Sequence, residues 1–126
     1  MVAIDHIALR FSSREHADVV LTSCLGLKKL KEFSIDANVS MAFFDIDSSM
    51  QIGVYGDELR LFEAFIIKEG DPIPPPAHCC LKVSNLEGVL ERARENGIEI
   101  RTAWVRDHDV YFIKDHDGNL YELKPL

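Results

Sequence analysis

The sequence contains few cysteines, and their arrangement argues against two kinds of site. Cys24, Cys79 and Cys80 are odd in number, two of them are adjacent, and no two form a CxxC pair. This arrangement indicates neither a disulfide framework nor a structural zinc knuckle, and it fits a reducing cytosol. The chain also lacks any window near the ~20 apolar residues that cross a bilayer, and its start shows no basic stretch followed by an apolar run. We therefore expect a cytoplasmic protein that does not enter a membrane.

Basic residues are outnumbered as well. The chain has 14 lysines and arginines against 21 aspartates and glutamates, a formal net charge of -7, and no basic cluster in the sequence. Proteins that bind nucleic acid usually gather basic residues, so we expect neither nucleic acid nor an anionic membrane surface as a partner. A length of 126 residues, with 47% hydrophobic and 28% charged residues, is typical of one globular domain with its own core.

Two stretches, 6–15 and 78–87, resemble each other. Each reads as a strand that stops at a serine, followed by a helix with one apolar face and a glycine at its end. We predict helix N-caps at Ser12 and Ser84, each completed by a glutamate three residues later in a capping box. The residues expected to form these features are the glutamates Glu15 and Glu87, the glycines Gly26 and Gly97, the apolar face Ala17, Val20, Leu21, Cys24 and Leu25, and the apolar face Leu86, Val89, Leu90 and Ala93.

The rest of each half is rich in β-branched, aromatic and aliphatic residues interrupted by turn residues, which predicts strands. A proline-rich stretch cannot join a central sheet and reads as a stiff linker. The chain is thus predicted to have an α+β fold of two tandem βαβββ modules within a single domain. The predicted ranges are strands 30–35, 41–46, 51–55 and 59–67 in module one (1–68), the linker 69–76, and strands 98–104, 110–114 and 120–123 in module two (77–126) of the domain 1–126. Module one thus has one strand-like range more than the unit requires, and the sequence leaves the division of its strands open.

The repeat places one histidine on the first strand of each module, His6 and His78. If a pseudo-two-fold relates the modules, these histidines face each other across a curved sheet, and Glu122 on the last strand completes a set of ligands. Two imidazoles and one carboxylate suit Fe(II), Ni(II), Mn(II), Co(II) or Zn(II), and they leave coordination positions open for a substrate. A single histidine or glutamate on a strand is more often a surface residue, so the repetition is what favours one divalent metal ion.

Four segments in this order resemble the vicinal oxygen chelate superfamily, which includes glyoxalase I, methylmalonyl-CoA epimerase, extradiol dioxygenases and bleomycin-binding proteins. The segments are IDHIAL at 4–9, LGL at 25–27, HCCLKV at 78–83 and YFIKDHDGNLYEL at 111–123. The resemblance covers nearly the whole chain. It implies paired βαβββ modules that form a curved mixed sheet around a metal cup, with His6, His78 and Glu122 as ligands. It also implies a homodimer, because relatives with two modules often pair.

Glyoxalase I usually places a fourth ligand, a glutamate, on the last strand of its first module. Aligning Gly56 with Gly118 puts Arg60 opposite Glu122, so an arginine takes that place in this alignment. Arg60 then binds a carboxylate or phosphate of the substrate, or is simply an exposed or ion-paired arginine. A shifted register brings in Glu63 instead, and the sequence does not settle the register.

The resemblance implies a divalent-metal-dependent lyase, isomerase or dioxygenase that acts on a small oxygenated substrate, which chelates the metal. The alternative is a metal-free binding or sequestration protein of the bleomycin-resistance type, because one fold can serve either purpose. Tyr111 and Tyr121 are candidates only if they face the cup. His108 is expected in an exposed loop, and His16 on a solvent-facing helix surface. The candidate residues are Glu122, Tyr121 and Glu63 for catalysis, Arg60 and Tyr111 for the substrate, and His6, His78 and Glu122 for the metal.

Overall fold

The fold is taken from a computed structural model that describes residues 2–67, 77–116 and 118–126. The predicted linker, 69–76, lies outside the described residues. None of the helices in these ranges has the length and apolar character needed to cross a membrane. In chain order the elements are β1 (Val2–Phe11), α1 (Arg14–Ala17), the π-helix η1 (Asp18–Cys24), β2 (Lys28–Ile35), α2 (Ala37–Phe44), β3 (Met50–Gly56), β4 (Arg60–Ile66), β5 (His78–Val83), α3 (Leu86–Glu95), β6 (Glu99–Val105), β7 (His108–Lys114) and β8 (Leu120–Pro125).

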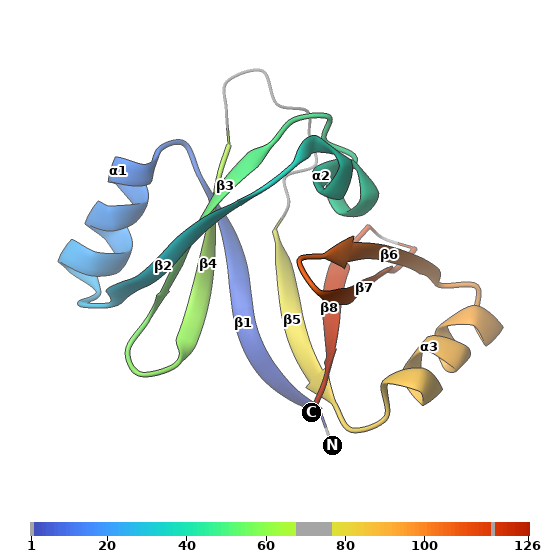
Figure 1. The fold of residues 1–126 in the computed structure, drawn as a ribbon. Coiled ribbons are helices and arrows are strands. Elements are labelled where there is room, and N and C mark those ends of the chain that lie inside the picture. Colours follow the sequence, from blue (N-terminus) through green and yellow to red (C-terminus); the bar gives the residue numbers. More distant parts are fainter. Residues whose placement is uncertain (1, 68–76, 117) are drawn as a thin grey trace.

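Across the described residues, eight strands form a single mixed sheet in the order β2-β3-β4-β1-β5-β8-β7-β6. The antiparallel pair β1–β5 lies at its centre, and each of these strands has a parallel partner on its other side, β4 or β8. The sheet curls strongly (Figure 1). Both halves follow the order strand, helix and three strands, and module one carries the additional helix α2 between β2 and β3. This confirms the predicted α+β fold of two tandem βαβββ units around a curved sheet.

The two faces of the sheet carry different helices. On the outer face, α1 and η1 pack against module one, and α3 packs against module two. On the inner face, α2 packs over the aromatic side chains of the central strands. The buried residues are Ala17, Leu21, Tyr55 and Ala64 under α1 and η1, Val83, Leu90 and Leu123 under α3, and Ala8, Phe43, Phe44, Ile46, Met50, Ile52, Phe65 and Phe112 on the inner face.

The curl brings the two ends of the sheet together. Arg106, in the turn between β6 and β7, places its guanidinium carbon 4.5 Å from the ring centre of Phe33 on the edge strand β2. A second link runs from Arg101 on β6 to the end of α2, where its Nη1 donates to the Phe43 carbonyl at 2.8 Å. The inner face is therefore closed at its sides and forms a hollow.

The predicted strand at 41–46 is wrong, because this segment belongs mostly to α2. A short apolar run is compatible with either a buried strand or a buried helix, so periodicity alone could not decide. The cap decides: the Asp36 carboxylate accepts a hydrogen bond from the Val39 amide at 2.9 Å and begins the helix. At the other end Asp45 adopts a left-handed conformation with φ of 60°. Asp36 is thus the N-cap of α2.

The other helices begin one residue later than predicted. Their caps are Ser13, which accepts from the His16 amide, and Asn85, which accepts from the Gly88 amide. Ser12 and Ser84 are therefore not the caps, and the proposed capping boxes do not form because the glutamates fall one position short. Gly26 and Gly97 both have positive φ, as expected of residues that end helices. The predicted apolar face of the first helix also fails at Cys24 and Leu25, which are exposed because the helix becomes a wider π-helix at Asp18.

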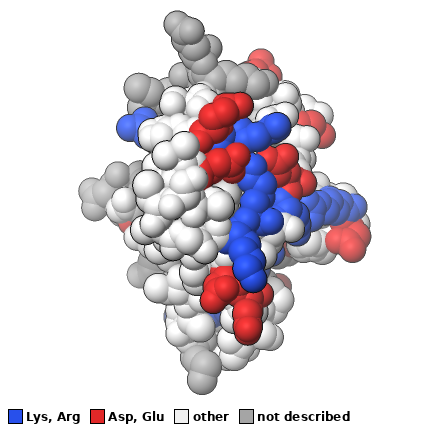
Figure 2. Space-filling model, turned by 90° about the vertical axis from the view of Figure 1, so that its left-hand side faces the viewer, with Lys and Arg blue, Asp and Glu red and all other residues white. Residues whose placement is uncertain are grey.

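Charged side chains cover the edge of module one. Figure 2 shows the face that carries α1 and β2, where basic and acidic side chains lie interleaved. Lys29 Nζ lies 2.8 Å from both Asp18 Oδ1 and Glu32 Oε1, and Arg14 Nε lies 3.2 Å from Glu32 Oε1. Exposed pairs of this kind add little to stability, but a charged edge strand discourages pairing with another sheet.

Candidate metal centre

The strand register places the four candidate ligands at equivalent positions in the two modules. At the centre of the sheet Ile7 pairs with Cys79, so His6 and His78 hold related positions one residue earlier on each strand. Glu122 pairs with Cys80, the residue after Cys79. Glu63 pairs with Ala8, the residue after Ile7. Glu63 and Glu122 are therefore related in the same way as the two histidines.

The alignment that placed Arg60 opposite Glu122 is wrong. It assumed that the turns after Gly56 and Gly118 have equal length, but the first turn continues through Leu59, whereas β8 begins at Leu120. A register irregularity at Tyr55 and Gly56 accompanies the longer turn. The shifted register, which we considered as the alternative, is the one observed.

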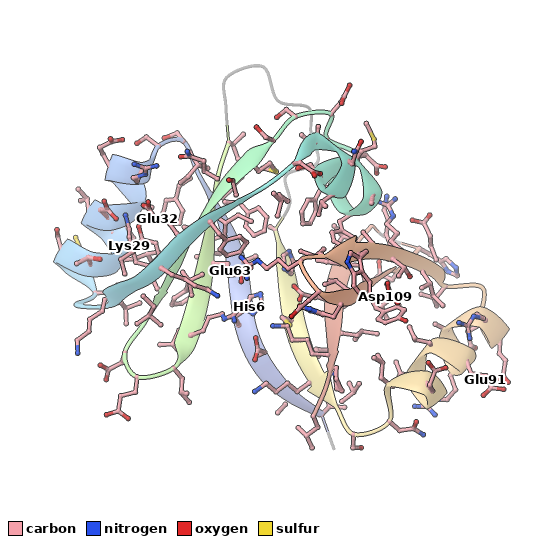
Figure 3. The ribbon with its side chains drawn as sticks, in the orientation of Figure 1. His6, Lys29, Glu32, Glu63, Glu91 and Asp109 are labelled. Atoms are coloured by element: carbon pink, nitrogen blue, oxygen red, sulfur yellow. The ribbon has the colours of Figure 1, made fainter. Side chains whose placement is uncertain are left out.

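The side chains converge within the hollow. His6 Nε2 lies 3.2 Å from Glu63 Oε1 and 3.7 Å from Glu122 Oε1. His78 Nε2 lies 3.2 Å from Glu122 Oε1. One ligand atom from each of the four residues lies within 4.8 Å of all the others, and all four residues are buried. Figure 3 shows His6 from β1 and Glu63 from β4 pointing toward one another.

These donors fit a divalent metal ion. Two atoms that each lie about 2.1 Å from one ion are at most about 4.2 Å apart, and the three distances above, 3.2, 3.7 and 3.2 Å, all meet this limit. His6 Nε2 is buried and makes no hydrogen bond in the described part of the chain, although a carboxylate oxygen lies close to it. Donors that approach without bonding to each other are what a shared cation requires.

Asp5 orients His6. Its Oδ2 lies 2.7 Å from His6 Nδ1, which leaves Nε2 directed at the centre of the cluster. A register irregularity in β1 between Ile4 and His6 includes Asp5. Lys82 and Lys124 also approach the Asp5 carboxylate, at 3.3 and 3.4 Å. Burial would raise the pKa of Asp5, but His6 and Lys124 outweigh it and hold that pKa at about 2. A carboxylate behind a histidine ligand is the usual outer-shell partner in metal sites.

Arg60 holds the second oxygen of Glu63. Its Nη1 donates to Glu63 Oε2 at 2.7 Å, which leaves Oε1 facing His6. Burial would raise the pKa of Glu63, but His6 and Arg60 overcome this effect and lower it. Burial would likewise lower the pKa of His6, but Glu63 and Asp5 raise it above its ordinary value. The imidazole of His6 and the carboxylate of Glu63 therefore favour each other's charged forms.

Aromatic rings surround His78. The Phe112 ring centre lies 4.8 Å from that of His78, and those of Phe65 and Phe44 lie at 5.6 and 5.8 Å. Phe44 comes from α2, so the helix that we predicted as a strand forms part of the wall around the ligands. The residues that line the hollow, which we call the cup, are Phe33, Ile35, Val39, Phe43, Phe44, Ile52, Arg60, Glu63, Phe65, His78, Val105, His108, Val110, Phe112, Glu122 and Lys124.

The structure does not bring the two candidate tyrosines to the cup. Tyr111 pairs with Leu123 and packs in the cluster under α3 on the outer face. Tyr121 neighbours Glu122 on β8, so its side chain takes the opposite face, and its hydroxyl donates to Asp115 Oδ2 at 3.0 Å. His16 is exposed. His108 is exposed too, but it begins β7 and lines the rim of the cup.

Sequence reasoning missed Asp5 and Lys124, and it ranked Glu63 below Arg60. The signal for Glu63 was present, since it is a charged residue between Phe62 and Ala64 in a strand that is otherwise apolar after Arg60. A charged residue in such a place needs a partner.

No protein-family model and no curated protein matches the chain. Solved structures do match it. A hypothetical protein from Bacillus halodurans has 20% identity and a TM-score of 0.67, covering 97% of this chain and 92% of its own. Methylmalonyl-CoA epimerase from Mycobacterium tuberculosis has 17% identity and a TM-score of 0.64, covering 98% and 87%. A glyoxalase/bleomycin resistance protein/dioxygenase superfamily member from Vibrio splendidus has 12% identity and a TM-score of 0.59, covering 98% and 97%. The chain therefore has the fold of this superfamily, as its sequence motifs predicted.

Proposed function

We propose that the chain is a divalent-metal-dependent enzyme in which His6, Glu63, His78 and Glu122 bind one metal ion. The substrate is a small molecule that chelates the ion through oxygen atoms, and the reaction is a proton transfer next to those oxygens. The observation that carries this proposal is the convergence of the four buried donors, whose ligand atoms lie within 4.8 Å of one another.

A bound divalent ion would supply Lewis acidity, which lowers the free energy of negative charge on a substrate oxygen. The residues of the chain do the rest. Among the described residues that line the cup, Glu63 and Glu122 are the carboxylates, and we assign acceptance of the substrate proton to one of them. Each has its second oxygen near a cation, Arg60 at 2.7 Å and Lys124 at 4.0 Å. The aromatic wall around His78 excludes water from the proton that moves.

Proton transfer is favoured over oxidative cleavage by the number of carboxylates. Iron oxygenases use two histidines and one carboxylate and keep the other positions open, whereas this cluster contains a second carboxylate. Extradiol dioxygenases usually add a histidine and a tyrosine ahead of the final glutamate, and the tyrosine nearest that place, Tyr111, packs on the outer face under α3. Methylmalonyl-CoA epimerases among the similar structures, including one described in complex with methylmalonyl-CoA and NH4+, support the same choice.

The alternative, a metal-free sequestration protein, has less support. Such a protein gains nothing from burying two imidazoles and two carboxylates together, because burying ionisable groups costs free energy unless they are paired or ligate a metal. The homodimer and the cytoplasmic location remain predictions, and light scattering of the purified protein would test the first.

Metal content is the experiment that tests the proposal. Gently purified protein should contain about one divalent ion per chain, or acquire it from Ni(II), Co(II), Mn(II), Fe(II) or Zn(II). At a metal concentration 100 times its Kd, binding should stabilise the fold by about 2.7 kcal/mol, which raises the melting temperature by roughly 10 °C. His6→Ala and His78→Ala should abolish both effects, and His16→Ala, in an exposed histidine, should leave them intact.

Activity is tested separately. The metal-loaded protein should catalyse loss of the proton signal of a 2-oxo or 2-acyl substrate in deuterium oxide, followed by NMR. A chain that stays metal-free with all five ions would refute the proposal and leave the binding protein as the explanation. A chain that binds metal but releases no substrate proton would refute the reaction only.

A further inference from the structure

Two cations line the cup and two more lie beside it, although the whole chain carries a net charge of -7. Arg60 and Lys124 line the cup directly. Lys31 Nζ and the guanidinium carbon of Arg106 lie 5.6 and 4.5 Å from the ring centre of Phe33, which also lines the cup. These cations come from β2, β4, the β6–β7 turn and β8, so only the curl of the sheet brings them together. We call them the cationic rim.

The cations of the rim repel one another. Burial first, and then the charges of Arg60 and Arg106, lower the pKa of Lys31. Glu63 compensates the positive charge of Arg60. The Asp5 and Glu122 carboxylates compensate the positive charge of Lys124.

Lys31 and Arg106 make no ion pair among the described residues. The acid beside Arg106, Asp107, pairs with His108 at 2.8 Å. Lys31 and Arg106 therefore concentrate positive charge that no ion pair among the described residues neutralises.

Arg106 also occupies a place that does not favour arginine. Its φ is 62°, in the left-handed region. Tight hairpin turns usually put asparagine, aspartate or glycine there, because a larger side chain is strained in this conformation. Formation of the turn therefore does not explain the arginine, but its position over Phe33 at the mouth of the cup does.

We infer that the substrate is a small organic anion whose negatively charged group lies at the cationic rim, away from the oxygens that chelate the metal. The cup offers three surfaces: the four metal-binding side chains, the aromatic and aliphatic wall under α2, and the rim. A molecule that satisfies all three has chelating oxygens at one end, an apolar middle and a charge at the other end. Such a rim also draws anions toward the cup from solution. This inference rests on the proposed function, because chelation fixes the position of the other end.

The test compares aromatic chelators that differ only in a remote charge. Benzohydroxamate and its 3-carboxy and 4-carboxy derivatives are titrated into the metal-loaded protein by calorimetry at low ionic strength. At least one carboxy derivative should bind roughly twofold to fivefold more tightly than benzohydroxamate, as expected of one partly exposed charge interaction. The double variant Lys31→Gln/Arg106→Gln should lose this advantage and bind benzohydroxamate as before. Arg92→Gln/Arg94→Gln, which removes the same charge from α3, should keep it.

Failure of this inference and failure of the proposed function give different results. Binding of all three chelators with equal Kd, or an advantage that survives in the Lys31→Gln/Arg106→Gln variant, overturns the rim while the metal site stands. If no metal binds, the proposed function fails, and the same chelators are followed by NMR in the metal-free protein. There the carboxy derivatives alone should shift the amide signals of Lys31 and Arg106. Equal shifts with benzohydroxamate would overturn the rim as well.

Discussion

Glu63 and Glu122 occupy related positions in the two halves of the sheet, because Glu63 lies opposite Ala8 on β1 and Glu122 lies opposite Cys80 on β5. The candidate metal cluster therefore contains one histidine and one glutamate from each module. This relationship leads to the first prediction, which concerns the fourth ligand.

Glu63→Gln should weaken metal binding by roughly 100-fold or more, because even outer-shell partners contribute 10–100-fold to affinity. Glu122→Gln should have a similar effect, and Arg60→Gln a smaller one of about tenfold, since Arg60 only holds the second oxygen of Glu63. Calorimetric titration with Ni(II) measures all three, with exposed Glu91→Gln as the control. If Glu63→Gln binds metal as the parent does, the site has three ligands and the Arg60–Glu63 pair is structural.

Asp5→Asn should reduce metal affinity by about 10–100-fold without unfolding the protein, because it removes the negative charge behind His6 Nδ1. Asp107→Asn is a matched control. Asp107 Oδ1 lies 2.8 Å from Nδ1 of the following residue, His108, in an exposed pair on the surface. Co(II) titration followed by visible absorption reports affinity and ligand geometry together. Equal effects of the two substitutions on metal affinity would show that Asp5 does not orient His6.

Arg101→Ala should destabilise the fold, because it leaves the Phe43 carbonyl without its donor at the end of α2 and breaks the contact with Asp45 at 3.1 Å. The loss should be about 1–3 kcal/mol, seen as a fall of several degrees in the melting temperature. Arg94→Ala, on the exposed side of α3, should change the melting temperature little. A stable Arg101→Ala variant would mean that apolar packing alone holds α2 against β6.

Tyr55→Phe should change how stability depends on alkaline pH. Burial and the Asp18 carboxylate, which accepts a hydrogen bond from the Tyr55 hydroxyl, raise the pKa of Tyr55 from its ordinary value of 10.0 to about 12. A raised folded pKa means that the contribution of this tyrosine is complete below about pH 10 and is lost as pH rises through 12. The parent should be more stable at neutral pH, and the two melting temperatures should converge above pH 11. A constant difference across this range would show that Tyr55 does not stabilise the fold through its neutral form.

The repeat was readable from the sequence because it is local. His6 and His78 stand at the same place in two similar segments, and the turn glycines Gly26 and Gly97 mark the ends of both helices. Alternating and amphipathic patterns depend only on neighbouring residues, so most strands and helices were predicted correctly; the exceptions are the shifted caps, the π-helix and the segment 41–46, which is mostly helical.

The sequence could not decide features that depend on turn length or on a second layer. The turn between β3 and β4 set the register that brings in Glu63 in place of Arg60. Packing on the inner face, with Asp36 as the cap, made α2 a helix. Because side chains alternate between the two faces along β7 and β8, Tyr111 and Tyr121 point away from the cup.

What the sequence determined by itself was therefore the duplicated α+β architecture and three of the residues that meet in the cluster, His6, His78 and Glu122. Only the tertiary structure decided the fourth residue, the orienting role of Asp5 and the cationic rim. The physical reason is that a strand shows its side chains alternately to two faces, so a shift of one residue reverses the face. Contacts between residues far apart in the chain, such as Arg106 with Phe33, exist only once the sheet has curled.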